Sequence, residues 1–305
     1  MLSVAVDSYL AARRAFGYQL ADSEDILRDF AAFAAAKSDT HVRTRTALDW
    51  IASRNGSPLR NCVRLRTVAL WARYLRAEDE RHEAPPQEAC GRHPSRRRPP
   101  FLFTPAQVAA IVAAARTLRS RGSLQPHVYS TLFGLLAATG MRISEALDLR
   151  VEDVTPAGLR VRNAKFGKSR LLPLRATTKE QLESYLERRL REAANCPFVF
   201  VSVGGARLHP TTVGAVFRRL VYTRGIARPE DKFRPRLHDL RFHFANQALS
   251  RCPNDHAGIG RHMVALTTYL GHRDARSGYW YLEATPALFA KIADRCQDFA
   301  MGVDG

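Results

Sequence analysis

The chain has 305 residues, enough for two domains with separate hydrophobic cores, and its 46% hydrophobic and 25% charged residues are typical of a globular protein. Its 47 lysines and arginines outnumber its 29 acidic residues, which gives a net charge of +18. A charge of this size favours a polyanionic partner, most often nucleic acid, although a ribosomal or membrane-surface partner would suit it equally well.

The sequence has no run of about 18 apolar residues, and its N-terminus lacks the basic, apolar and small-residue regions of a secretory signal. The five cysteines are widely scattered, without a C-x-x-C pair, which disfavours a disulfide framework or a zinc knuckle. These features predict a cytoplasmic protein with reduced thiols. The sequence also has no ATP, Mg²⁺ or nucleotide motif, so no metal, other cofactor or small-molecule substrate is expected. If the partner is DNA, the protein would be associated with the bacterial nucleoid.

Residues 1–85 are predicted to form an all-helical domain, because apolar residues recur there at helical spacing. In its last helix, from residue 59 to about residue 80, one stripe is predicted to face the core and contains Val63, Thr67, Leu70, Trp71 and Tyr74. Its polar side carries Arg60, Arg64, Arg66, Arg73 and Arg76. A run of this kind is usually a solvated helix face, but in so basic a chain contact with DNA phosphates is equally consistent.

Prolines and a glycine interrupt any regular helix before residue 101, and residues 86–100 are predicted to be a basic, semi-extended linker. Its Arg96, Arg97 and Arg98 are candidates to follow a DNA backbone. The second domain, residues 101–305, begins with a capping box at Thr104 and Gln107. It is predicted to be mainly helical with one small β-sheet.

Two short strands, 159–161 and 170–174, are expected to flank a basic hairpin tip that carries Lys165 and Lys168. A third, apolar strand is expected at residues 198–203. The whole chain is therefore predicted to be mainly α-helical with an α+β second domain.

The stretch Thr139-Gly140-Met141-Arg142-Ile143-Ser144-Glu145 follows an apolar helix predicted at residues 129–138. Gly140 can adopt a turn that other residues resist, so Arg142 sits on a backbone-defined corner. Its planar guanidinium can bind two phosphate oxygens at once. A surface arginine after a helix cap is the more ordinary interpretation of this stretch alone.

Three motifs later in the sequence make a phosphate-binding role for Arg142 the better interpretation. His238 and Arg241 are three residues apart and share one face of a helix, so both can point at the same phosphate. Leu270-Gly271-His272 places a second histidine after a glycine corner, and Tyr279-Trp280-Tyr281 follows. Each motif by itself is common on protein surfaces, but together they are better explained by phosphoryl transfer.

Taken in order, these motifs resemble the tyrosine recombinase (phage integrase) family over residues 101–285. Members of that family carry an arginine in a TGxRxSE-like turn, a lysine on a β-hairpin, an HxxR pair, an LGH and a tyrosine nine residues after that histidine. The resemblance therefore implies a catalytic set of Arg142, Lys165, His238, Arg241, His272 and Tyr281. Lys168 and Tyr279 remain the alternatives to Lys165 and Tyr281.

The resemblance implies that the helical first domain and the catalytic second domain form a DNA clamp. In the implied reaction Tyr281 attacks the scissile phosphorus and remains joined to the 3′ phosphate. Arg142 and Arg241 hold the non-bridging oxygens, and His238 accepts the tyrosine proton. Lys165 protonates the leaving 5′ oxygen, and His272 donates to a phosphate oxygen. Neither ATP nor a metal ion is required.

Glu145 and Asp239 are candidates to orient these groups, although either could be a simple helix-surface acid. The DNA-binding candidates are Arg60, Arg64, Arg73, Arg96, Arg97, Arg98 and Lys168. The resemblance further implies a homotetramer on double-stranded DNA, assembled through a tail helix after Thr285-Pro286. Within the family, the sequence most resembles integrases and transposases of mobile elements. The alternatives are a type IB topoisomerase, a non-catalytic DNA-binding regulator of the same fold and a metal-dependent nuclease that uses the histidines.

Overall fold

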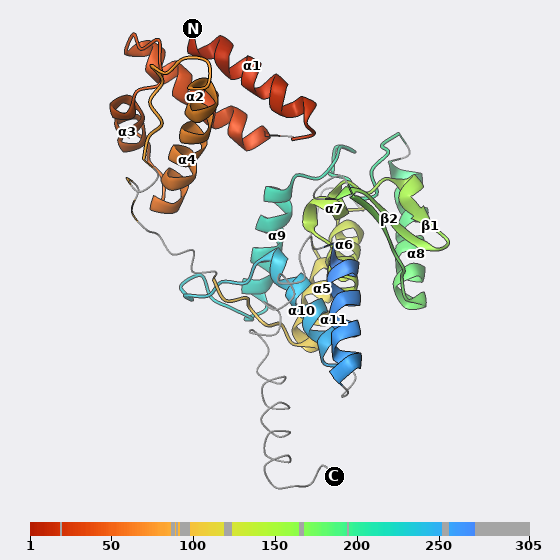
Figure 1. Ribbon diagram of the computed structural model, residues 1–305. Coiled ribbons are helices and arrows are strands. Elements are labelled where there is room, and N and C mark those ends of the chain that lie inside the picture. Colours follow the sequence, from red (N-terminus) through yellow and green to blue (C-terminus); the bar gives the residue numbers. More distant parts are fainter. Residues whose placement is uncertain are drawn as a thin grey trace. The chain divides into compact units, whose positions relative to one another are not determined.

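The computed structural model describes residues 1–18, 20–86, 89, 91, 98–118, 124–164, 168–193, 195–251 and 256–271, and the side chains of 163, 164, 168 and 256–259 lie outside that description. The chain divides into two compact units, Met1–Arg97 and Arg98–Gly305 (Figure 1). In the described part of the chain, no helix has the length and apolar character needed to cross a bilayer.

The described part of the first unit is a bundle of four α-helices. They are α1 (Leu2–Ala15), α2 (Ala21–Ala36), α3 (Thr44–Ala52) and α4 (Pro58–Leu75). Its core is aromatic: the Phe30 ring meets the Trp50 and Trp71 rings edge to face, with centroids 5.3 and 6.4 Å apart. All three side chains are fully buried, so this unit has a hydrophobic core of its own.

The predicted core stripe of α4 was largely wrong. Trp71 is fully buried, but Val63, Leu70 and Tyr74 are 51%, 46% and 39% exposed. The residues of α4 that are buried are Leu65, Val68, Ala69, Trp71, Ala72 and Leu75, and they face a core shared with α1, α2 and α3. Apolar residues occur on more than one side of this helix, so packing with its neighbours decided which side is buried.

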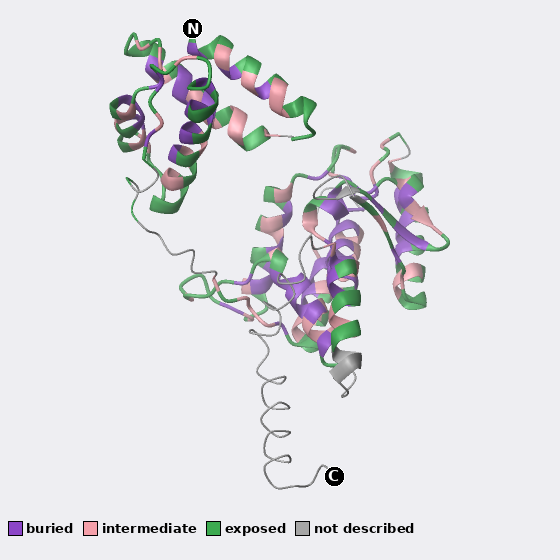
Figure 2. Cartoon of the chain, in the orientation of Figure 1, coloured by how far each residue is buried: buried purple, intermediate pink, exposed green. Residues whose placement is uncertain are grey.

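The second unit is built around α6 (Gln125–Thr139), which packs against α5 (Pro105–Arg116), α8 (Ala176–Glu192) and α10 (Leu237–Leu249). In Figure 2, α6 is coloured mainly as buried, whereas the outer faces of surrounding helices are exposed. The unit also contains two further long helices, α9 (Pro210–Thr223) and α11 (His256–Leu270).

A small antiparallel sheet lies beside the helices, in the order β1 (Val154–Thr155), β2 (Gly158–Ala164) and β3 (Lys168–Leu172). In its register Leu159 lies opposite Leu172 and Val161 opposite Arg170. The prediction of a mainly helical chain with one small sheet is confirmed.

The expected apolar strand at residues 198–203 does not join this sheet. Phe198 and Val201 form only isolated bridges, to Arg150 and Arg207. Val199, Phe200 and Val201 are nevertheless fully buried, because their apolar side chains fill the core of the unit.

Candidate active site

The Arg142 corner forms where α6 ends. Gly140 has φ +61°, in the left-handed region that glycine adopts without strain, and a Cβ there would lie 2.5 Å from the Phe244 ring. The short helix α7 (Ile143–Leu147) begins three residues later. The Glu145 carboxylate accepts the Arg142 backbone N–H (2.9 Å) and its guanidinium Nη1–H (2.7 Å). Both the backbone and the side chain of Arg142 are therefore held by one acid.

Glu145 is itself buried, with a side chain that is 5% exposed, and it accepts two more hydrogen bonds from Arg170. These join Arg170 Nη1 to Oε1 (3.1 Å) and Nη2 to Oε2 (2.8 Å). Burial raises the pKa of the Glu145 carboxyl, but the hydrogen bonds from Arg170 and from the Arg142 backbone outweigh it, so the pKa lies below its ordinary value. Glu145 is therefore a carboxylate at neutral pH, as the orientation of Arg142 requires.

His238 and Arg241 lie in the first turns of α10, which begins at Leu237. The buried Asp239 carboxylate accepts the N–H of Arg236 (2.7 Å) at the start of this helix. Burial raises the pKa of Asp239, and the hydrogen bonds from Arg236 oppose this effect. Asp239 thus fixes the start of the helix that carries the HxxR pair.

Arg241 is only 2% exposed and spans two segments that are distant in sequence. Its Nη1 donates to the Gly140 carbonyl (2.8 Å) and its Nη2 to the Leu270 carbonyl (2.7 Å). Arg142 Nη2 donates to the next carbonyl, that of Gly271 (3.2 Å). The two guanidinium groups therefore converge at the end of α11, and the Arg142 side chain, 23% exposed, is the more accessible.

His238 is exposed to solvent, but its ring lies 5.9 Å from the Phe242 ring and near three arginines. Desolvation lowers the pKa of its imidazole to about 4, and the positive charges of Arg241, Arg236 and Arg142 act in the same direction. Water screens part of this effect on an exposed residue, yet every contribution favours the neutral ring. At pH 7 His238 is therefore a neutral imidazole that can accept a proton.

Three of the six predicted catalytic residues thus lie near one another: Arg142 and Arg241 at the end of α11, and His238 close enough for their positive charges to lower its pKa. The other three, Lys165, His272 and Tyr281, lie outside the described residues, as does the alternative Tyr279. The last described residue before His272 is Gly271, whose carbonyl accepts a hydrogen bond from Arg142 Nη2.

The predicted DNA-binding residues have different surroundings. Arg60 and Arg73 are exposed on α4, and Arg64 is half-buried, with its guanidinium donating to the Asn61 side chain (3.1 Å). In the second unit, Arg98 donates to the Arg234 carbonyl (2.5 Å). Arg96, Arg97 and the side chain of Lys168 lie outside the described residues.

Sequence reasoning gave Arg170 no role beyond its place in a strand. The register puts Arg170 opposite Val161 and on the same face of β3 as Leu172. Val161 and Leu172 are both buried. In a strand, alternate side chains point to opposite faces, but with two adjacent leucines, Leu171 and Leu172, the sequence did not show which face is buried. Leu171 is 50% exposed in the structure.

His243, which follows the HxxR motif by two residues, is buried and its Nδ1 lies 2.9 Å from the Phe103 carbonyl, so its role is structural.

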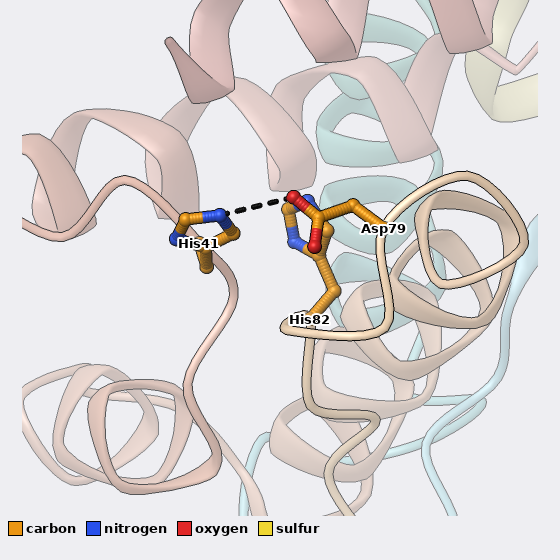
Figure 3. A group of neighbouring side chains, drawn as sticks. All are labelled: His41, Asp79 and His82. Carbon is orange, nitrogen blue, oxygen red and sulfur yellow. Dashed lines mark hydrogen bonds and ion pairs between the residues drawn. The ribbon is translucent and has the colours of Figure 1, made fainter.

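A separate group of possible metal ligands occurs in the first unit, where His41, Asp79 and His82 offer atoms within 4.8 Å of one another (Figure 3). His82 Nδ1 accepts the Val42 N–H (3.1 Å), so the proton of its neutral ring is on Nε2. The Asp79 carboxylate already binds the Arg81 guanidinium and backbone N–H and lies 3.1 Å from His41 Nε2. A metal-bound histidine donates from its second nitrogen, whereas His82 accepts there. This donor set therefore fits an internal hydrogen-bonded link better than a metal site.

Comparisons with known proteins agree with this geometry. The model of the phage integrase family matches residues 102–287, more than half of the chain. "Putative integrase/recombinase y4rB" of Sinorhizobium fredii is 35% identical over 302 residues, covering 96% of each chain. Tyrosine recombinase XerA of Pyrococcus furiosus is 28% identical, over 53% of this chain and 52% of its own.

Two solved structures share the fold at low sequence identity. The integrase of transposon Tn1549, in complex with transposon right-end DNA, has a TM-score of 0.64 and 16% identity over 96% of this chain and 98% of its own. A lambda integrase dimer bound to a core site has a TM-score of 0.61 and 16% identity over 92% and 76%. With the matched family model, the full-length relative and the converging Arg142 and Arg241, the chain belongs to the phage integrase family of tyrosine-type site-specific DNA recombinases.

Proposed function

We propose that this recombinase cuts and rejoins duplex DNA through a 3′-phosphotyrosyl intermediate, without ATP or a metal ion. The observation that carries the proposal is the convergence of Arg142 and Arg241 on the adjacent carbonyls of Gly271 and Leu270, beside the neutral imidazole of His238. Fixed positive charge next to a proton acceptor is the arrangement that a phosphoryl transfer between oxygen atoms needs.

In the proposed step the Tyr281 oxygen forms a bond to the scissile phosphorus, and the bond from phosphorus to the 5′ oxygen breaks. The phenol proton passes to His238, which is suited to accept it because its ring is neutral at pH 7. Lys165 donates a proton to the leaving 5′ oxygen. Since one phosphodiester bond replaces another, the 5′ hydroxyl of a strand can reverse the step and rejoin DNA.

Arg142 and Arg241 contribute unequally in this proposal. Arg142 is accessible and is held by Glu145, so its guanidinium is suited to bind a non-bridging oxygen as charge develops there. Arg241 is almost fully buried and its Nη atoms bind backbone carbonyls, so it contributes mainly positive potential and one edge of the site. His272 would donate to a second phosphate oxygen.

The first unit would bind DNA as the core-binding domain (residues 1–85), joined by the linker (86–100) to the catalytic domain (101–305). The exposed Arg60 and Arg73 of α4 support contacts with phosphates. We further propose that the protein works at the nucleoid and assembles as a tetramer through the segment after Thr285. A lambda integrase tetramer bound to a Holliday junction, with 16% identity and a TM-score of 0.61, is consistent with such an assembly.

The test is the capture of a covalent adduct. Duplexes retained by the wild-type protein from a random-sequence library are rebuilt with a nick near the cleavage position, so that a short 5′ hydroxyl strand diffuses away after attack. Protein joined to labelled DNA is then counted on a denaturing gel. Tyr281→Phe should abolish the adduct and leave DNA affinity nearly unchanged, and Tyr279→Phe should retain it.

If only Tyr279→Phe abolishes the adduct, the nucleophile has been misassigned. If the wild-type protein binds the selected duplex but forms no adduct, the proposed chemistry is wrong and DNA binding without cleavage becomes the better explanation. Exchange of strands between two duplexes, rather than relaxation of supercoils alone, would distinguish recombination from topoisomerase action.

A further inference from the structure

The last three carbonyls of the segment that ends α11 accept hydrogen bonds from three different arginines. The Tyr269 carbonyl accepts a hydrogen bond from Arg170 Nε (3.0 Å). The Leu270 carbonyl accepts one from Arg241 Nη2, and the Gly271 carbonyl accepts one from Arg142 Nη2. Carbonyls at a helix C-terminus lack partners within the helix and carry the negative end of its dipole, so they favour cations. The end of α11 therefore gathers three positive charges from three separate segments.

Arg170 differs from the other two arginines because it also binds the acid that orients Arg142. Its two Nη groups meet both oxygens of Glu145, and Glu145 Oε1 also accepts Arg142 Nη1. Arg170 thus binds the Glu145 carboxylate, which holds the Arg142 guanidinium, and the Tyr269 carbonyl, two residues before the carbonyl that Arg142 binds. Its own side chain is 13% exposed, so these contacts are shielded from water.

We propose that Arg170 is a positioning residue, which ties the orientation of the Arg142 guanidinium to the placement of β3 and of the last turn of α11. It does not contact the DNA phosphate. The inference rests on the proposed function in one respect, namely that Arg142 acts on the phosphate.

The contacts of Arg170 require arginine rather than positive charge alone. Its Nε, Nη1 and Nη2 each have a different hydrogen-bond partner atom, and a lysine ammonium at one point in space cannot reach all three. The Gly271 backbone adds a steric condition: φ is +68°, and a Cβ there would lie 2.8 Å from Arg170 Nη1. Arg170 therefore packs closely against a position that has no side chain.

The test compares Arg170→Lys and Arg170→Gln with a matched control, Arg162→Gln. Arg162 lies in β2 of the same sheet and pairs with the buried Asp153, so its replacement also leaves a buried carboxylate without its arginine partner. On the nicked duplex described above, both Arg170 variants should form adduct about 10–100-fold more slowly, because a displacement of roughly 1 Å at a reacting group can cost about 100-fold. DNA affinity should stay close to that of the wild type, and Arg162→Gln should keep its rate.

A double variant separates positioning from general destabilisation. If Arg170 acts through Glu145, Arg170→Gln combined with Glu145→Gln should be hardly slower than the slower single variant. Rates that fall by the product of the two single losses would overturn the inference, as would wild-type rates in both Arg170 variants. If wild-type protein forms no adduct, the proposed function fails, and the NMR measurement below then decides separately whether Arg170 positions Arg142.

A second measurement needs no DNA. The Nε–H NMR signal of Arg142, assigned by its loss in Arg142→Lys, should shift in both Arg170 variants and remain in place in Arg162→Gln. An unmoved Arg142 signal in the Arg170 variants would refute the positioning role even if cleavage were slowed.

Discussion

Replacing Gly140 by alanine should destabilise the unit formed by residues 98–305, because two separate features of the fold exclude a side chain there. The backbone has φ +61°, which an L-residue adopts at a cost of about 1–2 kcal/mol. The new Cβ would also lie 2.5 Å from Phe244 Cδ1 and 3.1 Å from Leu270 Cδ2. Phe244 cannot move aside easily, since its ring stacks on Tyr269 with centroids 5.4 Å apart.

Overpacking of this kind typically costs about 1–3 kcal/mol, so the two effects together lower the free energy of unfolding by about 2–5 kcal/mol. For a unit of this size about 3 kcal/mol corresponds to a fall in Tm of roughly 6–12 °C. Adduct formation should also slow, because the Gly140 carbonyl accepts Arg241 Nη1 and moves with the corner.

Gly134→Ala is the matched control, since Gly134 lies in the same helix, α6, and a Cβ there would meet no atom within 4 Å. Alanine is a better helix former than glycine, so this variant should be more stable by about 0.5–1 kcal/mol. Differential scanning calorimetry on the full chain measures both variants. Equal Tm values for Gly140→Ala and the wild type, or similar losses in both variants, would refute the steric reasoning.

Four further outcomes follow from the same geometry. The pKa of Glu145 is lower in the folded protein than its ordinary value of about 4.5. Its contribution to stability is therefore present above pH 4.5 and is lost as pH falls through the folded-state pKa. Glu145→Gln should flatten the acid side of a plot of Tm against pH. The pKa of His238 is about 4 in the folded protein, so the unfolded chain binds a proton at this residue first as pH falls. The free energy of unfolding should therefore fall between about pH 6.5 and about pH 4, and His238→Gln should remove part of that slope. If Arg60 and Arg73 bind phosphates, glutamine at either position should lower the salt dependence of log K by about 0.9 per lost contact, as filter binding at several salt concentrations would reveal. DNA cleavage should continue in excess EDTA, and loss of cleavage there would favour a metal-dependent nuclease.

Features that depend on neighbouring residues in the chain could be predicted from the sequence. The capping box was one: the Thr104 side chain accepts the Gln107 N–H (3.2 Å), and the Gln107 side chain accepts the Thr104 N–H (2.9 Å). The Gly140 corner was another, since α6 ends there in the left-handed conformation that glycine favours. These signals hold because a cap or a turn is completed within a few residues, whatever the rest of the fold does.

Features that depend on packing could not be predicted. The sequence placed Val63 and Leu70 in the core, but the structure leaves them exposed, because α4 has apolar residues on several sides and only its neighbours select one. The role of Arg170 had no local signal either, since its partners Glu145 and Tyr269 are 25 and 99 residues away.

The sequence by itself therefore determined the family motifs, the helices and the corner that carries Arg142. Only the tertiary structure decided that Arg170 and the carbonyls that end α11 join Glu145 around that arginine, because these groups are distant in sequence and come within hydrogen-bonding distance only when α7, α11 and the sheet pack together.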